Sequence, residues 1–190
     1  WKGRELDVVT GAEAIGHFKG IRADLEKVPV AFTMLEAIDH VAVERQPMPE
    51  AFRLLVGALA TLDKGAGPVL LGAFLLKLLV LEGVGPSTDR CARCTKEAVL
   101  VAFDPEAGGF LCRDCRSGRA VPQETMALVR QVLGGELRTA LGAPASRTTA
   151  DFERLVMLGT EHHLERRLRS ASSSVVKGTL HQRDLSQEPA

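Results

Sequence analysis

The sequence predicts a mainly α-helical fold, a helical bundle into which a small β-hairpin module is inserted. In several segments bounded by Gly and Pro, apolar residues recur at helical spacing. Residues 89–120 differ from these segments, because they combine a β-like apolar run with all four cysteines of the chain. Hydrophobic residues make up 45% of the 190 residues, which is enough to fill a buried core.

Residues 1–16 are predicted to hold one strand and its exit from a neighbouring domain. Charged residues and β-formers mix from Arg4 to Val9, and the turn residues Thr10 and Gly11 follow. A single strand has no sheet partner here, so we expect it to be the last piece of a domain otherwise missing from this sequence. The chain begins with Trp rather than Met, which fits a fragment or a processed chain.

Residues 17–88 are predicted to form the first part of a helical domain, with three antiparallel helices joined by short links. The helices run from Arg22 to Val43, onward from Pro49, and from Pro68 to about Leu81. Proline suits the first turn of a helix, and the glycines between the segments suit helix ends. The positions predicted to face the core are Leu25, Val28, Phe32, Leu35 and Ile38 in the first helix and Phe52, Leu55, Val56, Leu59 and Leu62 in the second.

Residues 89–120 are predicted to form a separate module built on a β-hairpin. The run from Val99 to Phe103 is β-like, Gly108 and Gly109 suit a turn, and a second strand begins at Phe110. Two C-x2-C pairs flank the hairpin and are separated by 17 residues. The hairpin therefore returns the second pair to the side of the first.

This cysteine spacing is typical of structural zinc sites. A two-residue gap lets a tight turn direct both sulfurs at one ion, and soft thiolates favour zinc over calcium or magnesium. Four thiolates also complete the tetrahedron, which leaves no position for a catalytic water. The sequence thus predicts a zinc-ribbon-like module with structural Zn2+ held by Cys91, Cys94, Cys112 and Cys115.

Two disulfides or an iron–sulfur cluster would use the same four cysteines, and the sequence leaves both alternatives open. A thioredoxin-like redox pair is disfavoured, because it belongs beside a βαβ unit rather than between helices and a hairpin. A zinc nucleobase deaminase is excluded, since it needs an H-x-E upstream of the C-x-x-C, and neither His17 nor His40 is followed by Glu two residues later.

Residues 121–170 are predicted to complete the helical domain. One helix follows Pro122, with Met126, Val129 and Leu133 facing inward, and Gly ends it. A last helix runs to about Ser170, and its predicted capping box pairs Thr148 with Asp151. Residues 171–190 are Ser-rich and polar, and we expect a disordered tail there.

Composition bounds the function. Lys+Arg and Asp+Glu are both 24, so a uniformly basic nucleic-acid binder is excluded, whereas a local basic face is not. Aromatic residues are only 4% of the chain and Tyr is absent, which leaves little material for base-stacking platforms. The longest apolar run, residues 69–81, is shorter than the roughly 20 residues needed to cross a bilayer. No membrane association is expected, and the cysteine pattern points to a reducing cytoplasm.

Two groups of arginines are candidates for contact with nucleic-acid phosphates. Residues 90–119 carry six basic and four acidic side chains, which makes them the most basic part of the chain. For the arginines around the cysteines, the favoured interpretation is that they balance the negative charge of the zinc–thiolate site. For those at residues 166–169, it is that they compensate the dipole at the end of a helix. The candidates are Arg90, Arg93, Arg113, Arg116, Arg119, Arg166, Arg167 and Arg169.

Taken in order, the segments resemble the RecO family of DNA repair proteins over about residues 5–170. The resemblance begins with L-D-V-V-T-x-A-E at residues 6–13, where the last strand of an N-terminal OB-fold would end. The ordered set around the four cysteines makes the resemblance specific. Its further stretches are R-A-D-L-E-K (22–27), P-E-A-F-R-L-L (49–55), L-L-x-L-x-G-x-G-P (78–86), D-R-C-A-R-C (89–94), G-G-F-L-C-R-D-C (108–115) and H-H-L-E-R-R-L-R-S (162–170).

The resemblance implies a non-enzymatic recombination mediator in the bacterial cytoplasm, associated with the nucleoid. RecO-like proteins bind single- and double-stranded DNA, anneal strands, and partner RecR. They also engage the acidic C-terminal tail of the single-strand-binding protein and promote RecA loading. The sequence departs from the family in lacking most of the OB-fold, of which residues 1–16 would be a remnant. The alternative is a zinc-ribbon protein–protein adaptor or regulator without DNA binding.

Overall fold

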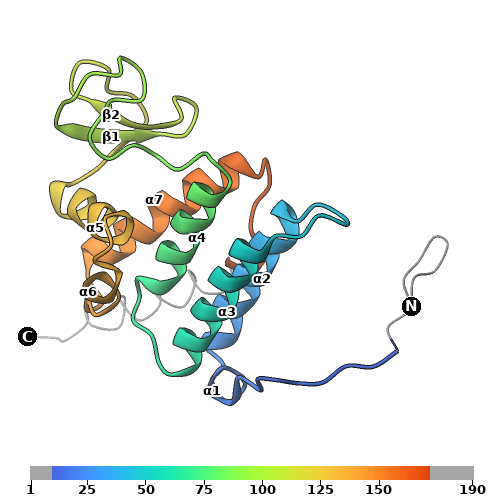
Figure 1. Ribbon diagram of the computed structural model, residues 1–190. Helices are drawn as coiled ribbons and strands as arrows, with labels where there is room; N and C mark the ends of the chain where they lie inside the picture. The colour runs from blue at the N-terminus through green and yellow to red at the C-terminus, as the bar shows by residue number, and fades with distance from the viewer. Residues whose placement is uncertain (1–9, 172–190) are drawn as a thin grey trace, which may run out of the picture.

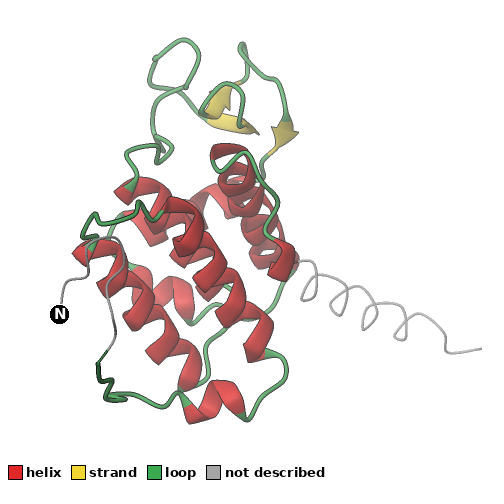
Figure 2. Ribbon diagram, turned by 90° about the vertical axis from the view of Figure 1, so that its right-hand side faces the viewer, coloured by secondary structure: helices red, strands yellow, loops and turns green. Residues whose placement is uncertain are grey.

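The computed structural model describes residues 10–171, so the strand expected at residues 4–9 and the tail expected beyond residue 171 lie outside the described residues. Helices form most of the described chain, and a small sheet lies at one end of them (Figures 1 and 2). Within the described part, no helix is long and apolar enough to span a membrane. The elements are α1 (Lys19–Arg22), α2 (Lys27–Val41), α3 (Pro49–Asp63), α4 (Leu70–Leu81), β1 (Leu100–Asp104), β2 (Gly109–Cys112), β3 (Arg119–Ala120), α5 (Gln123–Leu133), α6 (Leu137–Leu141), α7 (Arg147–His163) and the 3-10 helix η1 (Arg169–Ala171).

The helix predicted from Arg22 begins at Lys27, and α2 buries only part of the predicted face. Val28 and Ile38 are partly buried against the core, as predicted. Leu25 lies in the turn between α1 and α2 and is 81% exposed, while Phe32 and Leu35 are 56% and 43% exposed. Met34 and Ala37 are fully buried instead. Two apolar stripes run along α2, and the one with alanines permits closer approach of neighbouring helices. Helical spacing alone could not show which stripe faces the core.

The prediction for α3 was correct in its inner positions and wrong at its edge. Leu55, Leu59 and Leu62 are buried, as predicted. Phe52 and Val56 are 65% and 39% exposed, because the buried face turns toward Ala51 and Ala58. The exposed side chains of Phe52 and Val56 therefore contribute little to the core.

The central element of the fold is α4, which packs against α3 on one side and α7 on another (Figure 1). Nine of its twelve residues are buried, which explains why its sequence is apolar almost all round. Gly72 provides the close contact with α7. A Cβ at this position would lie 2.6 Å from the ring of Phe152, which is fully buried.

The second helical part confirms α5, but α6 was not predicted and α7 has other limits. The N-cap of α7 is Ser146, whose hydroxyl accepts a hydrogen bond from the Thr149 N–H, while the Thr149 hydroxyl accepts from the Ser146 N–H. The predicted pair of Thr148 and Asp151 is therefore wrong, since a cap must precede the first helical turn. The helix ends at His163 rather than Ser170.

The chain leaves α7 through a turn that holds Glu165 in the left-handed region, at φ 52°. The N–H of Arg166 donates to the carbonyl of Glu161 at 3.2 Å, which closes the helix end. Leu168 then returns to the core and is 1% exposed. Residues 162–170, which the sequence predicts as part of a closing helix, are thus the end of α7 followed by a non-helical segment whose Leu168 side chain is buried.

Replacing Glu165 by glycine is expected to stabilise the protein by about 1 kcal/mol, because a side chain in the left-handed region costs about 1–2 kcal/mol and glycine avoids it. Chemical denaturation measures the free energy of unfolding. The matched control is Arg166→Gly, at an exposed neighbour without a positive φ, which should give no gain. A loss of stability in Glu165→Gly would contradict the assignment of this turn.

Glu36 on α2 holds the end of the described chain. Its carboxylate accepts hydrogen bonds from the N–H groups of Arg169 and Ser170, both at 3.0 Å. Burial alone would raise the pKa of Glu36, but the N–H groups of Ser170 and Arg169 outweigh it and hold the pKa below its usual value. The charged form of Glu36 is therefore the one that binds η1.

Replacing Glu36 by glutamine is expected to cost about 1 kcal/mol near neutral pH, because a charge-assisted pair of hydrogen bonds is weakened. A carboxyl whose pKa is lower in the folded state stabilises the protein above its unfolded pKa of about 4.3, and this contribution disappears as pH falls through the folded pKa. Denaturation of both proteins over a pH series measures the difference. Glu13→Gln, at an exposed residue, is the control. A difference that persists in strong acid would contradict this role.

Candidate metal centre

The module is a three-stranded antiparallel sheet in the order β2-β1-β3, built on the predicted hairpin. Gly109 pairs with Asp104 and Phe110 with Phe103 across β1 and β2. The third strand was not predicted, since β3 has only two residues. It is reached through Gly118, whose φ of 69° and contact with the Phe103 carbonyl leave no room for a Cβ. The turn at Gly118 therefore directs the chain back along β1.

Each cysteine pair lies in a tight turn at the same end of the sheet. In the first, the N–H of Thr95 donates to the Cys91 carbonyl at 2.8 Å, and the N–H of Cys91 donates to Lys96 at 3.0 Å. The second turn begins at Cys112, the last residue of β2. The N–H of Ala92 donates to the Phe110 carbonyl at 2.8 Å and joins the first turn to β2. The hairpin thereby brings both pairs together, as the sequence analysis expected.

The four sulfurs form one cluster. All four Sγ atoms lie within 4.8 Å of one another, and the cysteines are free rather than disulfide-bonded. The Sγ atoms of Cys94 and Cys112 are 3.9 Å apart. Four thiolates at about 2.3 Å from a tetrahedral zinc would be roughly 3.8 Å apart. The cluster could therefore hold a metal ion of this size.

The surroundings of Cys91 and Cys115 shift their pKa values in opposite directions. Burial alone would raise the pKa of Cys91, but hydrogen bonds from the backbone N–H groups of Cys112, Cys94 and Arg93 lower it to about 6. For Cys115, the hydrogen bond with the Cys94 thiol and burial raise the pKa to about 12. A bound cation would favour the charged form of all four sulfurs.

Arg93, in the first cysteine turn, is hydrogen-bonded to residues in and after the second turn. Its guanidinium donates to the Cys115 carbonyl at 3.1 Å and to the Ser117 hydroxyl at 3.0 Å. It also lies 3.8 Å from the Asp104 carboxylate. The hydrogen bond from Ser117 lowers the pKa of Asp104, so this carboxyl stays charged. Arg93 is thus tied to the module itself.

The other arginines predicted to contact phosphate fall into three groups. Arg90 pairs with Glu97 at 2.9 Å, and Arg119 lies 3.6 Å from Asp151 on α7. Arg113 and Arg116 are exposed beside the second cysteine turn. The remaining predicted arginines, 166, 167 and 169, are exposed after the end of α7 and do not continue that helix. Those in the last group therefore do not lie in the final turn of α7, where a helix dipole would be compensated.

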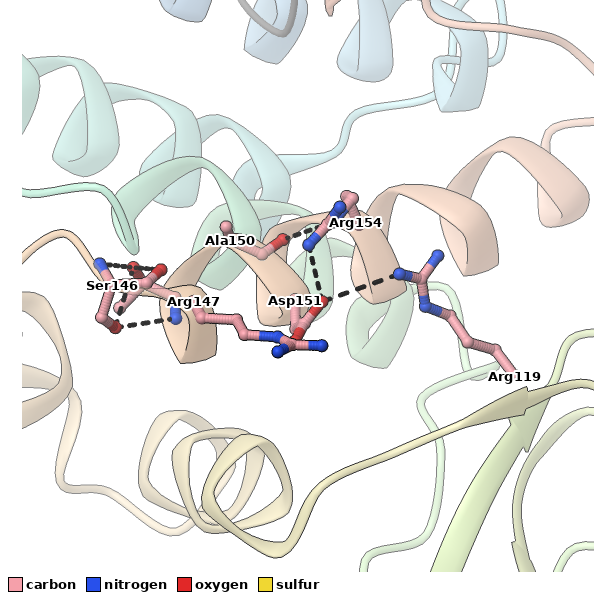
Figure 3. Close-up of polar contacts among 7 residues, drawn as sticks. Arg119, Ser146, Arg147, Ala150, Asp151 and Arg154 are labelled. Carbon is pink, nitrogen blue, oxygen red and sulfur yellow. Dashed lines mark hydrogen bonds and ion pairs between the residues drawn. The ribbon is translucent and has the colours of Figure 1, made fainter. Parts of the chain in front are cut away.

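Sequence reasoning missed a basic cluster at the junction of the module and α7, which we term the Asp151 cluster. The carboxylate of Asp151 is 2.6 Å from Arg154, 3.6 Å from Arg119 and 3.8 Å from Arg147 (Figure 3). The spacing of the three α7 residues was visible in the sequence as i,i+3 and i,i+4 pairs. The approach of Arg119, 32 positions away from Asp151, depends on β3 and was not visible.

The module also shares its core with the helices. Phe103 of β1 meets Phe110 of β2 edge-on at a ring separation of 5.2 Å. Its ring also lies against Gly159 of α7, where a Cβ would come within 3.0 Å of it. The buried apolar residues of the sheet belong to the same cluster as those of the helices.

Comparison with known proteins gives a consistent result over most of the chain. Residues 22–172 match the family described as Recombination protein O C terminal. The chain is 38% identical to the DNA repair protein RecO of Nocardioides sp. over 178 residues, which are 89% of the chain and 72% of that relative. It is 37% identical to the DNA repair protein RecO of Desulforudis audaxviator, over 89% of the chain and 70% of the relative. It is also 34% identical to the DNA repair protein RecO of Cutibacterium acnes, over 89% and 72%. The family resemblance predicted from the ordered segments is confirmed, and the chain belongs to the RecO family of DNA repair proteins.

Proposed function

We propose that this chain is the zinc-binding helical part of a non-enzymatic recombination mediator that binds DNA and partner proteins. The observation that carries the proposal is the family match over residues 22–172, which spans the helices and the four-cysteine module together. Its relatives are DNA repair proteins, so a role in DNA repair is common to the family.

The proposed cofactor is a structural Zn2+ held by the four cysteines. The cluster fits this ion, because the donor set is all sulfur and the distance between Cys94 and Cys112 is close to that of a tetrahedral site. Bound zinc would supply a charge that holds four thiolates and both turns together. With four protein ligands it would have no open position, which supports a structural rather than a catalytic role.

The proposed partners are single- and double-stranded DNA, RecR, and the acidic C-terminal tail of the single-strand-binding protein, in the bacterial cytoplasm. Exposed arginines 113, 116, 166, 167 and 169 support contact with phosphates or acidic side chains. A pocket of about 180 Å³ between β1, α4 and α7 is lined by Leu79, Phe103 and His162 among others. Such a pocket suits the apolar side chains of a partner segment.

Annealing of two complementary labelled oligonucleotides tests the proposal. The chain is expected to bind single strands and accelerate annealing at low salt without a nucleotide cofactor. Both effects should weaken steeply as salt rises, because binding releases counterions from the phosphates. Absence of DNA binding and of annealing at low salt would overturn the mediator proposal.

The alternative, a protein–protein adaptor without DNA binding, is favoured by one observation. Arg90, Arg93 and Arg119 are each engaged by groups of the protein itself, which is what charge balance within the module requires. An adaptor would bind a peptide with the acidic tail sequence while showing no DNA shift at low salt. The same titrations therefore separate the two functions.

A further inference from the structure

The Asp151 cluster places three guanidinium groups around one carboxylate. Arg147 and Arg154 come from α7, and Arg119 comes from β3 (Figure 3). Arg154 also donates to the Ala150 carbonyl at 3.3 Å, which fixes its side chain along the helix. Among the ion pairs of residues 10–171, these three arginines share this single acidic partner, so the cluster has an excess of two positive charges.

The guanidinium groups lie outside the carboxylate and face solvent. The side chain of Asp151 is 15% exposed, whereas those of Arg147, Arg154 and Arg119 are 93%, 51% and 46% exposed. Each guanidinium has about five N–H donors, while a carboxylate offers about four acceptor positions for all of them. Most donors of the cluster therefore remain available to a ligand.

The start of α7 gives an independent indication that the cluster is not arranged for stability. Arg147 is the first residue of the helix, and the first turn has no acidic residue. A positive charge at this end opposes the helix dipole, where an acidic residue would stabilise the helix. A residue placed against this local preference is characteristic of a functional site.

From these observations we propose that the Asp151 cluster binds the backbone phosphates of a nucleic-acid strand. The inference rests on the proposed DNA-binding function and assigns part of it to a surface. Planar guanidinium forks match phosphate oxygens, and the positive end of α7 adds to the attraction. Arg147 and Arg154 are seven residues apart, about 10 Å along the helix, so the cluster can contact more than one phosphate. The Asp151 carboxylate holds the three guanidinium groups in place while neutralising only one of their three positive charges.

The test measures binding of a labelled single-stranded oligonucleotide to the full chain by fluorescence anisotropy over a salt series. Loss of one phosphate contact reduces the slope of log K against log salt by about 0.7, which is about fivefold in affinity at 0.1 M salt. Arg147→Gln is expected to show this change, and Arg147→Gln/Arg154→Gln about 1.4 in slope and roughly 25-fold in affinity.

Two comparisons separate binding from folding and from net charge. Arg147→Gln removes a charge that opposes the helix dipole, so its melting temperature should stay unchanged or rise while DNA binding falls. Arg22→Gln/Arg53→Gln removes two exposed charges on α1 and α3 and should leave the slope unchanged.

The outcomes distinguish this inference from the proposed function. If the native chain binds DNA with a steep salt dependence and both Arg147 variants bind equally well, the cluster is not a phosphate site and the DNA-binding function stands. If the native chain does not bind DNA at low salt, both proposals fail. If the variants lose binding only to an acidic peptide, the cluster is a protein contact and the inference is wrong.

Discussion

Replacing Cys112 by serine is expected to abolish binding of the proposed Zn2+ and to unfold the module at residues 89–120. Cys112 ends β2 and faces Cys94 across the cluster, so its loss removes one of four ligands and the link between the two turns. In small zinc-binding peptides the metal contributes about 10–16 kcal/mol to folding, and most of this would be lost locally. Elemental analysis measures the metal, and amide hydrogen exchange follows the module and α5 separately.

The helices should keep most of their protection in this variant, because none of the four cysteines lies on a helix. Phe103 does contact α7. Unfolding of the module would uncover the face of α7 near Gly159, and the amides there should exchange faster than those in the rest of that helix. Ala98→Ser places the same new residue at an exposed position of the module and should keep a full complement of metal. A stoichiometric metal content in Cys112→Ser, or none in the native chain, would refute the centre.

Replacing Phe152 by alanine is expected to destabilise the protein by about 3–5 kcal/mol, the range for truncating a buried aromatic ring. Phe152 is fully buried, and its ring fills the space that Gly72 of α4 leaves open. Neither backbone can close the cavity without moving a whole helix. Denaturant unfolding followed by circular dichroism measures the change in the free energy of unfolding.

The control for this prediction is the same substitution at an exposed phenylalanine. Phe52 is 65% exposed on α3, so Phe52→Ala should change stability by less than about 1 kcal/mol. Equal effects of the two variants would contradict the packing of α4 on α7. A large effect of Phe52→Ala alone would mean that Phe52 faces the core, as the sequence predicts, and would contradict its exposure in the structure.

The success of the sequence predictions depended on the range of the interactions involved. The cysteine spacing, the hairpin turn at Gly108 and the Gly/Pro ends of the helices are local signals, and the structure places these elements where they were expected. The cap of α7 is local too, but Thr148, Ser146 and Thr149 are all suitable polar residues, and the backbone conformation decides among them. Propensity alone could not make that choice.

The faces of the helices show why the remaining features needed the fold. Phe32 is larger and more apolar than Ala31, yet Ala31 is buried, since close packing of helices rewards shape as well as hydrophobicity. The Asp151 cluster depends likewise on a two-residue strand that delivers Arg119 to α7.

By itself, the amino-acid sequence determined the mainly helical class of the fold, the cluster of four cysteines and the family, because these depend on residue types at short spacings and on their order. Only the tertiary structure decided which stripe of each helix is buried, where the last helix ends and which arginines meet one carboxylate. These features depend on contacts between residues distant in the chain, and packing and electrostatic energies act on distances in space rather than on positions in sequence.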